Sequence, residues 1–104
     1  METKFIYGLS WRNDGYGEVL PQSATLAVSN DKEKLMKMMR ELVEKDCKEI
    51  KREDYGEDWE YEEVVRYNKH NFKVLVDHGE EVVLTHRINN EICVTYEIET
   101  IEVI

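Results

Sequence analysis

The strongest pattern along the chain is an amphipathic helix over about residues 30–52. Apolar residues recur there at spacings of three and four, which places them on one helix face: Leu35, Met38, Met39, Leu42, Val43, Cys47 and Ile50. Asn30 suits the N-cap, and Glu33, three residues later, completes a capping-box pattern. We therefore predict one long helix whose apolar face, including the Met38-Met39 pair and Cys47, fills the core.

The N-terminal quarter alternates apolar and polar residues in the way that strands do. Residues 4–11 form the first run, and residues 24–28 form the second, after Pro21. Between them, residues 13–17 hold two glycines that can adopt positive φ in a turn. We predict a β-hairpin with an extended loop.

The C-terminal part predicts an antiparallel meander. Three stretches alternate in polarity: residues 72–76, 82–88 and 92–98. Residues 77–79 predict one turn, and Asn89-Asn90 suggests a two-residue hairpin, because asparagine tolerates positive φ. The alternation changes phase at Thr100, which is consistent with a β-bulge.

Residues 59–67 fit two patterns. As a strand, they place four large residues on one face, with Glu63 as the exception: Trp59, Tyr61, Val65 and Tyr67. As a helix, they align Tyr61, Val64, Val65 and Asn68. Aromatic and β-branched residues favour extended backbone, so we predict a strand and keep the helix as the alternative.

Together these elements predict a single α+β domain over residues 1–104. We expect a mostly antiparallel sheet of about five or six strands, with one main amphipathic helix (about 30–52) packed on one face. The order along the chain is β-β-α-β-β-β, with a sixth strand as the alternative. One wet and one dry face is typical of such a sheet, and the helix covers the dry face.

Charge is concentrated in two segments. The net charge is −9, residues 53–63 hold seven acids and no base, and residues 91–104 hold four acids and no base. The remaining 79 residues carry a net charge of +2. Direct nucleic-acid binding requires a basic surface, so we do not expect it. A basic protein partner fits the charge better.

The sequence also predicts a cellular setting. Cys47 and Cys93 lie 46 residues apart without paired spacing, which is typical of reducing conditions. Residues 1–11 do not resemble a signal peptide, because Gly8 and Ser10 interrupt their apolar run. Since no stretch of ~18 apolar residues occurs, we expect no membrane span and a cytoplasmic location.

Candidate catalytic and metal-binding residues do not form a recognisable motif. The potential metal ligands lack the close pairs that zinc sites use: Cys47, His70, His78, His86 and Cys93. The serines Ser10, Ser23 and Ser29 lie in no nucleophile motif, and Ser29 suits the helix cap instead. Burial should make the Cys47 thiol inert. We therefore expect a protein that is not an enzyme and has no cofactor or metal.

One segment combines acids with aromatic residues and is the candidate partner-binding site. Its members are Asp54, Tyr55, Glu57, Asp58, Trp59, Glu60, Tyr61, Glu62 and Glu63. Aromatic residues are common at binding hot spots, and carboxylates steer basic partners towards a surface. The alternative is that Trp59 and Tyr61 face the core while the acids face water.

The layout resembles a group of small proteins. The chain has an N-terminal aromatic strand, a Gly15-Tyr16-Gly17 loop and a helix that opens with residues 30–34, and it closes with residues 96–103. In these features it resembles uncharacterised single-helix α+β proteins of bacterial, phage and mobile-element genomes. The resemblance covers residues 5–40 and 92–104, and it implies no catalytic residues. Leu35-Met36 departs from the small residue more usual there.

Two hypotheses for function follow. The first is a small acidic interaction or regulatory protein that binds a basic protein surface, in its sharper form as a nucleic-acid mimic. The second is a structural or oligomer-forming protein, such as a homodimer, that uses an exposed strand edge. The final strand suggests this, because four of its last seven residues are apolar: Ile98, Ile101, Val103 and Ile104. A small enzyme is the least favoured hypothesis.

Overall fold

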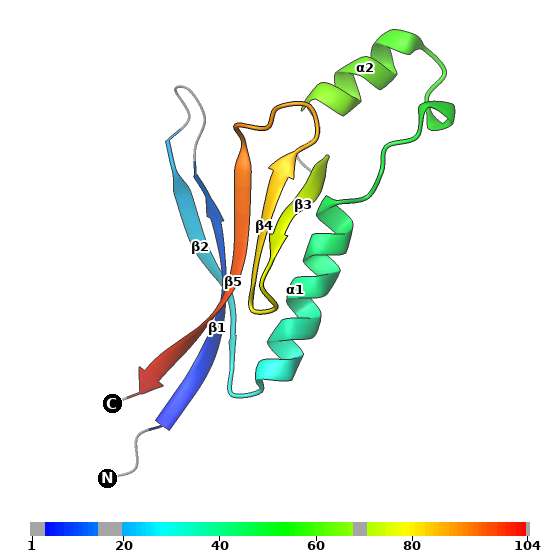
Figure 1. The fold of residues 1–104 in the computed structure, drawn as a ribbon. Helices are drawn as coiled ribbons and strands as arrows, with labels where there is room; N and C mark the ends of the chain where they lie inside the picture. Colours follow the sequence, from blue (N-terminus) through cyan, green and yellow to red (C-terminus); the bar gives the residue numbers. More distant parts are fainter. Residues whose placement is uncertain (1–3, 15–19, 68–70, 104) are drawn as a thin grey trace.

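The computed structural model describes residues 4–14, 20–67 and 71–103. Along the chain the elements are β1 (Lys4–Asn13), β2 (Gln22–Ser29), α1 (Lys32–Asp46), a 3₁₀ turn η1 (Arg52–Asp54), α2 (Asp58–Tyr67), β3 (Phe72–Asp77), β4 (Glu81–His86) and β5 (Cys93–Val103). The strands form one antiparallel sheet in the order β2-β1-β5-β4-β3, and α1 lies along one face (Figure 1). The predicted α+β class and mainly antiparallel sheet are confirmed.

The core lies between α1 and the inner face of the sheet. Strand register places apolar residues side by side there, with Leu9 opposite Ile98 and Leu84 opposite Val94. The buried cluster contains Leu9, Leu35, Met39, Val43, Phe72, Val82, Leu84, Val94, Tyr96 and Ile98. Burial of these side chains is the main force holding the helix on the sheet.

Helix α1 is shorter than predicted at both ends. Its N-cap is Asp31 rather than Asn30, because the Asp31 side chain accepts a hydrogen bond from the Lys34 amide at 3.3 Å. Ser29 contributes as expected, since its hydroxyl accepts from the Asp31 amide. The helix ends at Asp46, and the Cys47 carbonyl accepts a hydrogen bond from Arg87 instead of from the next helical turn. Residues 47–51 therefore leave the helix.

The prediction of a strand at residues 59–67 is wrong, because residues 58–67 form α2. The chain order is therefore β-β-α-α-β-β-β, with two helices rather than one. A helix satisfies its own backbone hydrogen bonds without a neighbouring strand. Asp58 and Glu60 in the first turn also interact favourably with the helix dipole. None of the described strands pairs with residues 58–67. These local interactions therefore outweigh the β propensity of the segment.

Strand β5 differs from the prediction at Thr100. The β1–β5 register is regular from Lys4 opposite Val103 to Asn13 opposite Val94, so there is no bulge at Thr100. Instead Ile101 faces the outer side of the sheet, where a Cβ added to Gly8 would lie 3.0 Å from its Cδ1. The change of phase in the sequence therefore marks the point where the apolar residues of β5 pass from the inner face of the sheet to the outer face.

The β4–β5 connection is longer than the predicted two-residue hairpin. Strand β4 ends at His86, whose ring nitrogen Nδ1 accepts hydrogen bonds from the amides of Ile88 and Asn89. These bonds turn the chain before Asn90, and β5 begins only at Cys93. The predicted hairpin between β1 and β2 is confirmed, although residues 15–19 of its loop lie outside the described residues.

The final strand offers only part of an edge to the oligomer hypothesis. Strand β5 lies between β1 and β4, but β4 pairs with it only from Cys93 to Glu97. Among the described strands, residues 99–103 of β5 pair with β1 alone. The two edges are β2 and β3, and each pairing shows a register shift at a leucine, Leu26 in β2 and Leu75 in β3. Such bulges commonly prevent edge strands from pairing with other chains.

Candidate functional site

The candidate site is the acidic arm, defined as residues 52–67, which includes η1 and α2. Figure 1 shows α2 beyond the end of the sheet and not over either face. All ten residues of α2 are described, and none is buried. Trp59 is 62% exposed and Tyr67 is 71% exposed. The arm therefore presents large aromatic side chains that the rest of the described chain does not cover.

Arg52 organises the base of the arm. Its guanidinium forms an ion pair with Asp58 and donates a hydrogen bond to the Tyr55 carbonyl at 2.7 Å. The same group lies 5.7 Å from the centre of the Tyr61 ring, and Tyr55 and Tyr61 have ring centroids 6.2 Å apart. Tyr61 is therefore covered by Arg52 and Tyr55 and does not belong to the core.

At its other end the arm is joined to the sheet through Asn71. The Asn71 side-chain amide donates to the Val65 carbonyl at 2.5 Å, and Asn71 itself is buried just before β3. This bond fixes the last turns of α2 at the start of the edge strand. It leaves the Trp59 side of the helix open to solvent.

The structure brings the predicted partner-binding residues together on this arm. Those exposed to solvent are Asp54, Glu57, Asp58, Trp59, Glu62 and Glu63, and those half-buried are Tyr55, Glu60 and Tyr61. The alternative that Trp59 and Tyr61 face the core is wrong, because neither belongs to the buried cluster. The acids and aromatics share one helix and the turn before it.

Sequence reasoning missed two members of this surface, Val64 and Tyr67. They line a hollow of about 420 Å³ together with Tyr55, Glu60 and Glu63. Four of these residues follow helical spacing along α2: Glu60, Glu63, Val64 and Tyr67. This helical spacing could have identified Val64 and Tyr67 from the sequence. The strand interpretation hid it, because a strand places these residues on different faces.

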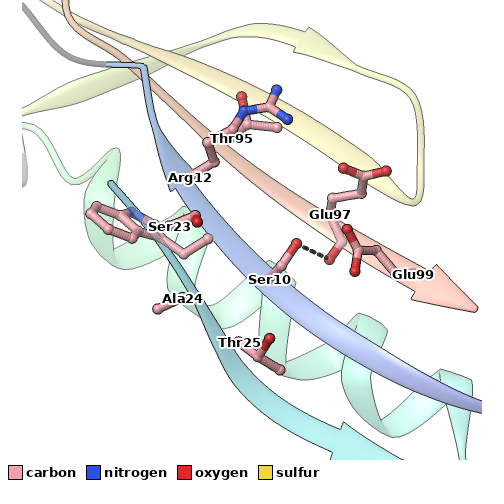
Figure 2. Close-up of a pocket in the computed structure, with 9 residues that line it drawn as sticks. Ser10, Arg12, Ser23, Ala24, Thr25, Thr95, Glu97 and Glu99 are labelled. Atoms are coloured by element: carbon pink, nitrogen blue, oxygen red, sulfur yellow. Dashed lines mark hydrogen bonds between the residues drawn. The ribbon is translucent and has the colours of Figure 1, made fainter. Parts of the chain in front are cut away.

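Three of the four acids in the second acidic segment lie on β5. Glu97 and Glu99 lie on the outer face of the sheet, on a polar hollow of about 450 Å³ (Figure 2). The Ser10 hydroxyl donates to the Glu97 carbonyl there at 3.4 Å. Glu102 lies opposite Phe5, on the other side of the strand from these two acids. These three acids therefore lie apart from the acidic arm, whereas Glu91 lies in the β4–β5 connection, at the end of the sheet where α2 stands (Figure 1).

The remaining candidate catalytic residues have structural environments. The Cys47 thiol is half-buried, and burial, followed by the nearby Asp46, raises its pKa. His86 is buried against Phe72, and His78 lies exposed in the β3–β4 turn. His70 lies outside the described residues. Among the described residues, no three potential ligands are grouped to hold a metal ion.

Asp46 and Tyr96 form a buried polar pair that the sequence pattern did not single out. The Tyr96 hydroxyl donates to Asp46 Oδ2 at 2.5 Å, and both residues are almost fully buried. Burial, followed by the Asp46 carboxylate, raises the pKa of Tyr96 well above its usual range. Asp46 lies three residues after Val43 on the buried side of α1, so the pair ties the end of the helix to β5.

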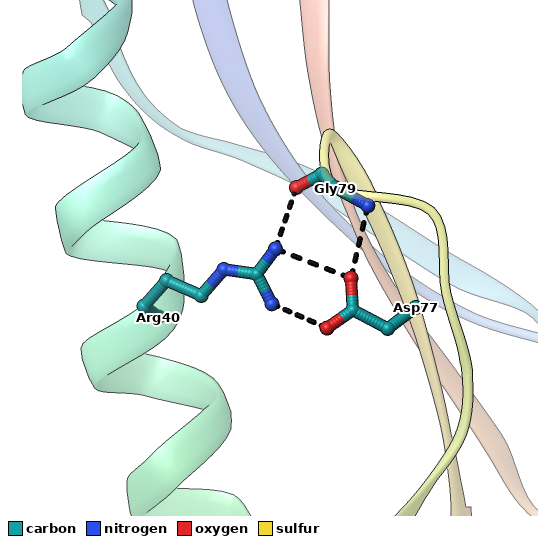
Figure 3. A network of polar contacts seen from close by, with 3 residues as sticks. All are labelled: Arg40, Asp77 and Gly79. Atoms are coloured by element: carbon teal, nitrogen blue, oxygen red, sulfur yellow. Dashed lines mark hydrogen bonds and ion pairs between the residues drawn. The ribbon is translucent and has the colours of Figure 1, made fainter.

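A second polar contact joins α1 to the β3–β4 turn (Figure 3). Arg40 binds both carboxylate oxygens of Asp77, at 2.6 and 3.1 Å, and also donates to the Gly79 carbonyl. The Gly79 amide donates back to Asp77, in a turn where Gly79 has a φ of +87°. These contacts raise the pKa of Arg40 and lower the pKa of Asp77. Lys32 and Glu80 form an ion pair at the same turn.

We expect Arg40→Gln to make the protein modestly less resistant to urea at pH 7. The effect is small because both side chains are partly exposed to water. Since the pKa of Asp77 is lowered from its ordinary value of 3.8, the pair stabilises the fold above that pH. The urea midpoints of the variant and the wild type should therefore converge as the pH falls below about 4.

The matched control for this experiment is Arg12→Gln. Arg12 pairs with Asp14, only two residues away, so it joins no separate elements. It should change the urea midpoint less than Arg40→Gln at pH 7. A difference between wild type and Arg40→Gln that persists unchanged at pH 2 would contradict the assigned role of Asp77.

Comparison of the chain with protein-family models, with curated proteins and with solved structures finds no match. Among the described residues, no helix has the length and apolar character that crossing a membrane requires.

Proposed function

We propose that this protein is a non-enzymatic interaction protein that binds a basic surface of a protein partner through the acidic arm. The observation that carries the proposal is that α2 buries no residue while Trp59 stands 62% exposed. Large exposed aromatics are costly to leave in water and are frequent at binding hot spots. A partner that covers Trp59 would remove its side chain from water.

Charge supports a basic partner. The segment 53–63 carries seven acids and no base, and six of the nine residues proposed to bind are exposed. Lys45, Lys48 and Lys51 line a different hollow at the end of α1, next to Tyr55. A cationic partner would therefore approach α2 from the side away from these lysines. Its association should be fast at low salt and weaken as salt screens the charges.

In its sharper form the proposal is a nucleic-acid mimic. Carboxylates spaced along α2 present negative charge at intervals, as a phosphate backbone does. The arm would then occupy the nucleic-acid groove of a DNA- or RNA-binding protein, and DNA would compete with it for the same partner.

A homodimer through a strand edge is the second candidate. Strand β3 favours it, because Leu75 is 57% exposed on an edge of the sheet. The bulge at the same residue opposes regular pairing with another strand. Sedimentation of the wild type and of Leu75→Lys distinguishes the two: a dimer that dissociates in the variant would favour this candidate.

The test of the main proposal uses purified protein with a Trp59→Ala, Glu62→Gln variant. A partner captured from cells is identified and purified, and its affinity is then measured by titration calorimetry at two salt concentrations. We expect the double variant to bind at least about tenfold more weakly, as loss of a hot-spot residue requires. Higher salt should weaken wild-type binding.

The matched control is Glu97→Gln, Glu99→Gln, which removes two charges from the outer face of the sheet. It should leave the affinity within about twofold of wild type, because that face is separate from the arm. Equal losses in both variants would show that only net charge matters and would overturn the assignment to the arm. Competition by duplex DNA for the partner tests the mimic.

A further inference from the structure

The hollow on α2 has the chemistry of a site for a cationic side chain. Its lining comes from two tyrosines and a valine, with two carboxylates: Tyr55, Tyr67, Val64, Glu60 and Glu63. Its volume is about 420 Å³. Aromatic faces attract cations through the ring quadrupole, and carboxylates accept their hydrogen bonds. Apolar walls and negative rims therefore occur together within two turns of α2, with Tyr55 added from the turn before it.

The arm already contains one cation held by this combination. The Arg52 guanidinium lies 5.7 Å from the centre of the Tyr61 ring and pairs with Asp58. Tyr61 in turn contacts Tyr55, which also lines the hollow. Tyr55 therefore lies between two clusters that each combine tyrosine with a carboxylate, one around Arg52 and the other lining the hollow. Arg52 occupies one of them, and the described residues that line the other include no basic side chain.

We propose that this hollow binds an arginine side chain presented by the partner protein. The inference rests on the proposed function, and it names the group that the acidic arm recognises. The guanidinium stacks on Tyr67 or Tyr55, and its N–H groups donate to Glu60 and Glu63. Arginine fits better than lysine, because its planar fork can stack on a ring and donate to two carboxylates at once.

The test uses the full-length ¹⁵N-labelled protein and two probes, acetylated tetra-arginine amide and acetylated tetra-lysine amide. Amide shifts are followed at 50 mM salt, and the dissociation constants are taken from the titrations. We expect tetra-arginine to shift the amides of Glu60, Glu63, Val64 and Tyr67, and to bind at least about threefold more tightly than tetra-lysine.

Variants separate the role of the hollow from that of charge alone. Tyr67→Ala should weaken tetra-arginine binding about five- to tenfold, while Tyr67→Phe, which keeps the ring, should retain wild-type affinity. Glu63→Gln should weaken binding, whereas Glu97→Gln, an equal change of charge on the outer face of the sheet, should have less than about a twofold effect. Because Tyr67 is 71% exposed, its replacement should leave the fold intact, which circular dichroism checks.

The outcomes distinguish this inference from the proposed function. Shifts confined to Trp59 and Glu62 that Tyr67→Ala does not change would overturn the arginine site while supporting a basic partner for the arm. Equal affinity for both probes would also overturn the choice of arginine. If neither probe shifts any amide of residues 52–67 at 50 mM salt, both proposals fail.

Discussion

Replacing Met39 by alanine is expected to lower the free energy of unfolding by about 3 kcal/mol. Met39 has no exposed surface and lies in the middle of α1, facing the sheet. Alanine would remove three heavy atoms from the core and leave a cavity that the surrounding side chains only partly fill. Urea unfolding followed by circular dichroism measures the loss.

Met38 is the matched control for this prediction. It was expected to share the core with Met39, but the structure leaves it 42% exposed beside β2. Met38→Ala should therefore cost less than about 1 kcal/mol. Equal effects of the two substitutions would mean that α1 is rotated about its axis relative to the arrangement described.

Tyr96→Phe is expected to lower the free energy of unfolding by about 2 kcal/mol at neutral pH. The substitution removes a hydroxyl that donates to the buried carboxylate of Asp46, and it leaves the ring in place. Hydrogen bonds to buried charged groups are among the more costly to lose. Urea unfolding at pH 7 gives the difference between variant and wild type.

The same pair predicts a dependence on alkaline pH. Because the pKa of Tyr96 is raised in the folded state, its protonated form is stabilised by folding. That stabilisation is complete below the ordinary tyrosine value of about 10 and is lost as the pH rises above it. The stability of the wild type should therefore fall towards that of Tyr96→Phe between about pH 10 and 12. A constant difference over this range would contradict the prediction.

The sites of stability and of proposed binding are separate in this protein. The stabilising contacts of Met39 and Tyr96 lie between α1 and the sheet, whereas the acidic arm buries none of the residues of α2. Substitutions such as Trp59→Ala should therefore change affinity without changing the stability of the core. This separation allows the binding experiments to be interpreted without a correction for unfolding.

Much of the scaffold was predictable from local patterns. The spacing of Leu35, Met39 and Val43 identified α1, and alternation identified all five strands of the sheet. These predictions succeeded because a helix or strand that covers a core must repeat apolar residues at its own period. The candidate segment was also found from composition, since acids and aromatics lie close together in the chain.

Other features depended on neighbours that are distant in sequence. Val64 and Tyr67 join the hollow only because residues 58–67 are helical, and β propensity favoured the wrong structure there. Ile101 lies on the outer face of the sheet, where Gly8 on the adjacent strand leaves room for its side chain. The sequence pattern did not single out Asp46, because its buried partner, Tyr96, comes from the distant strand β5.

The sequence by itself thus determined the helix that covers the sheet, the mainly antiparallel character of the sheet and the location of the acidic segment. Periodicity and composition are local properties, and these features need nothing more. Only the tertiary structure decided that β5 lies in the centre of the sheet, that α2 stands away from it and that Glu97 and Glu99 are apart from the acidic arm. Strand order and the placement of a helix depend on which distant residues pair, and no local pattern encodes that choice.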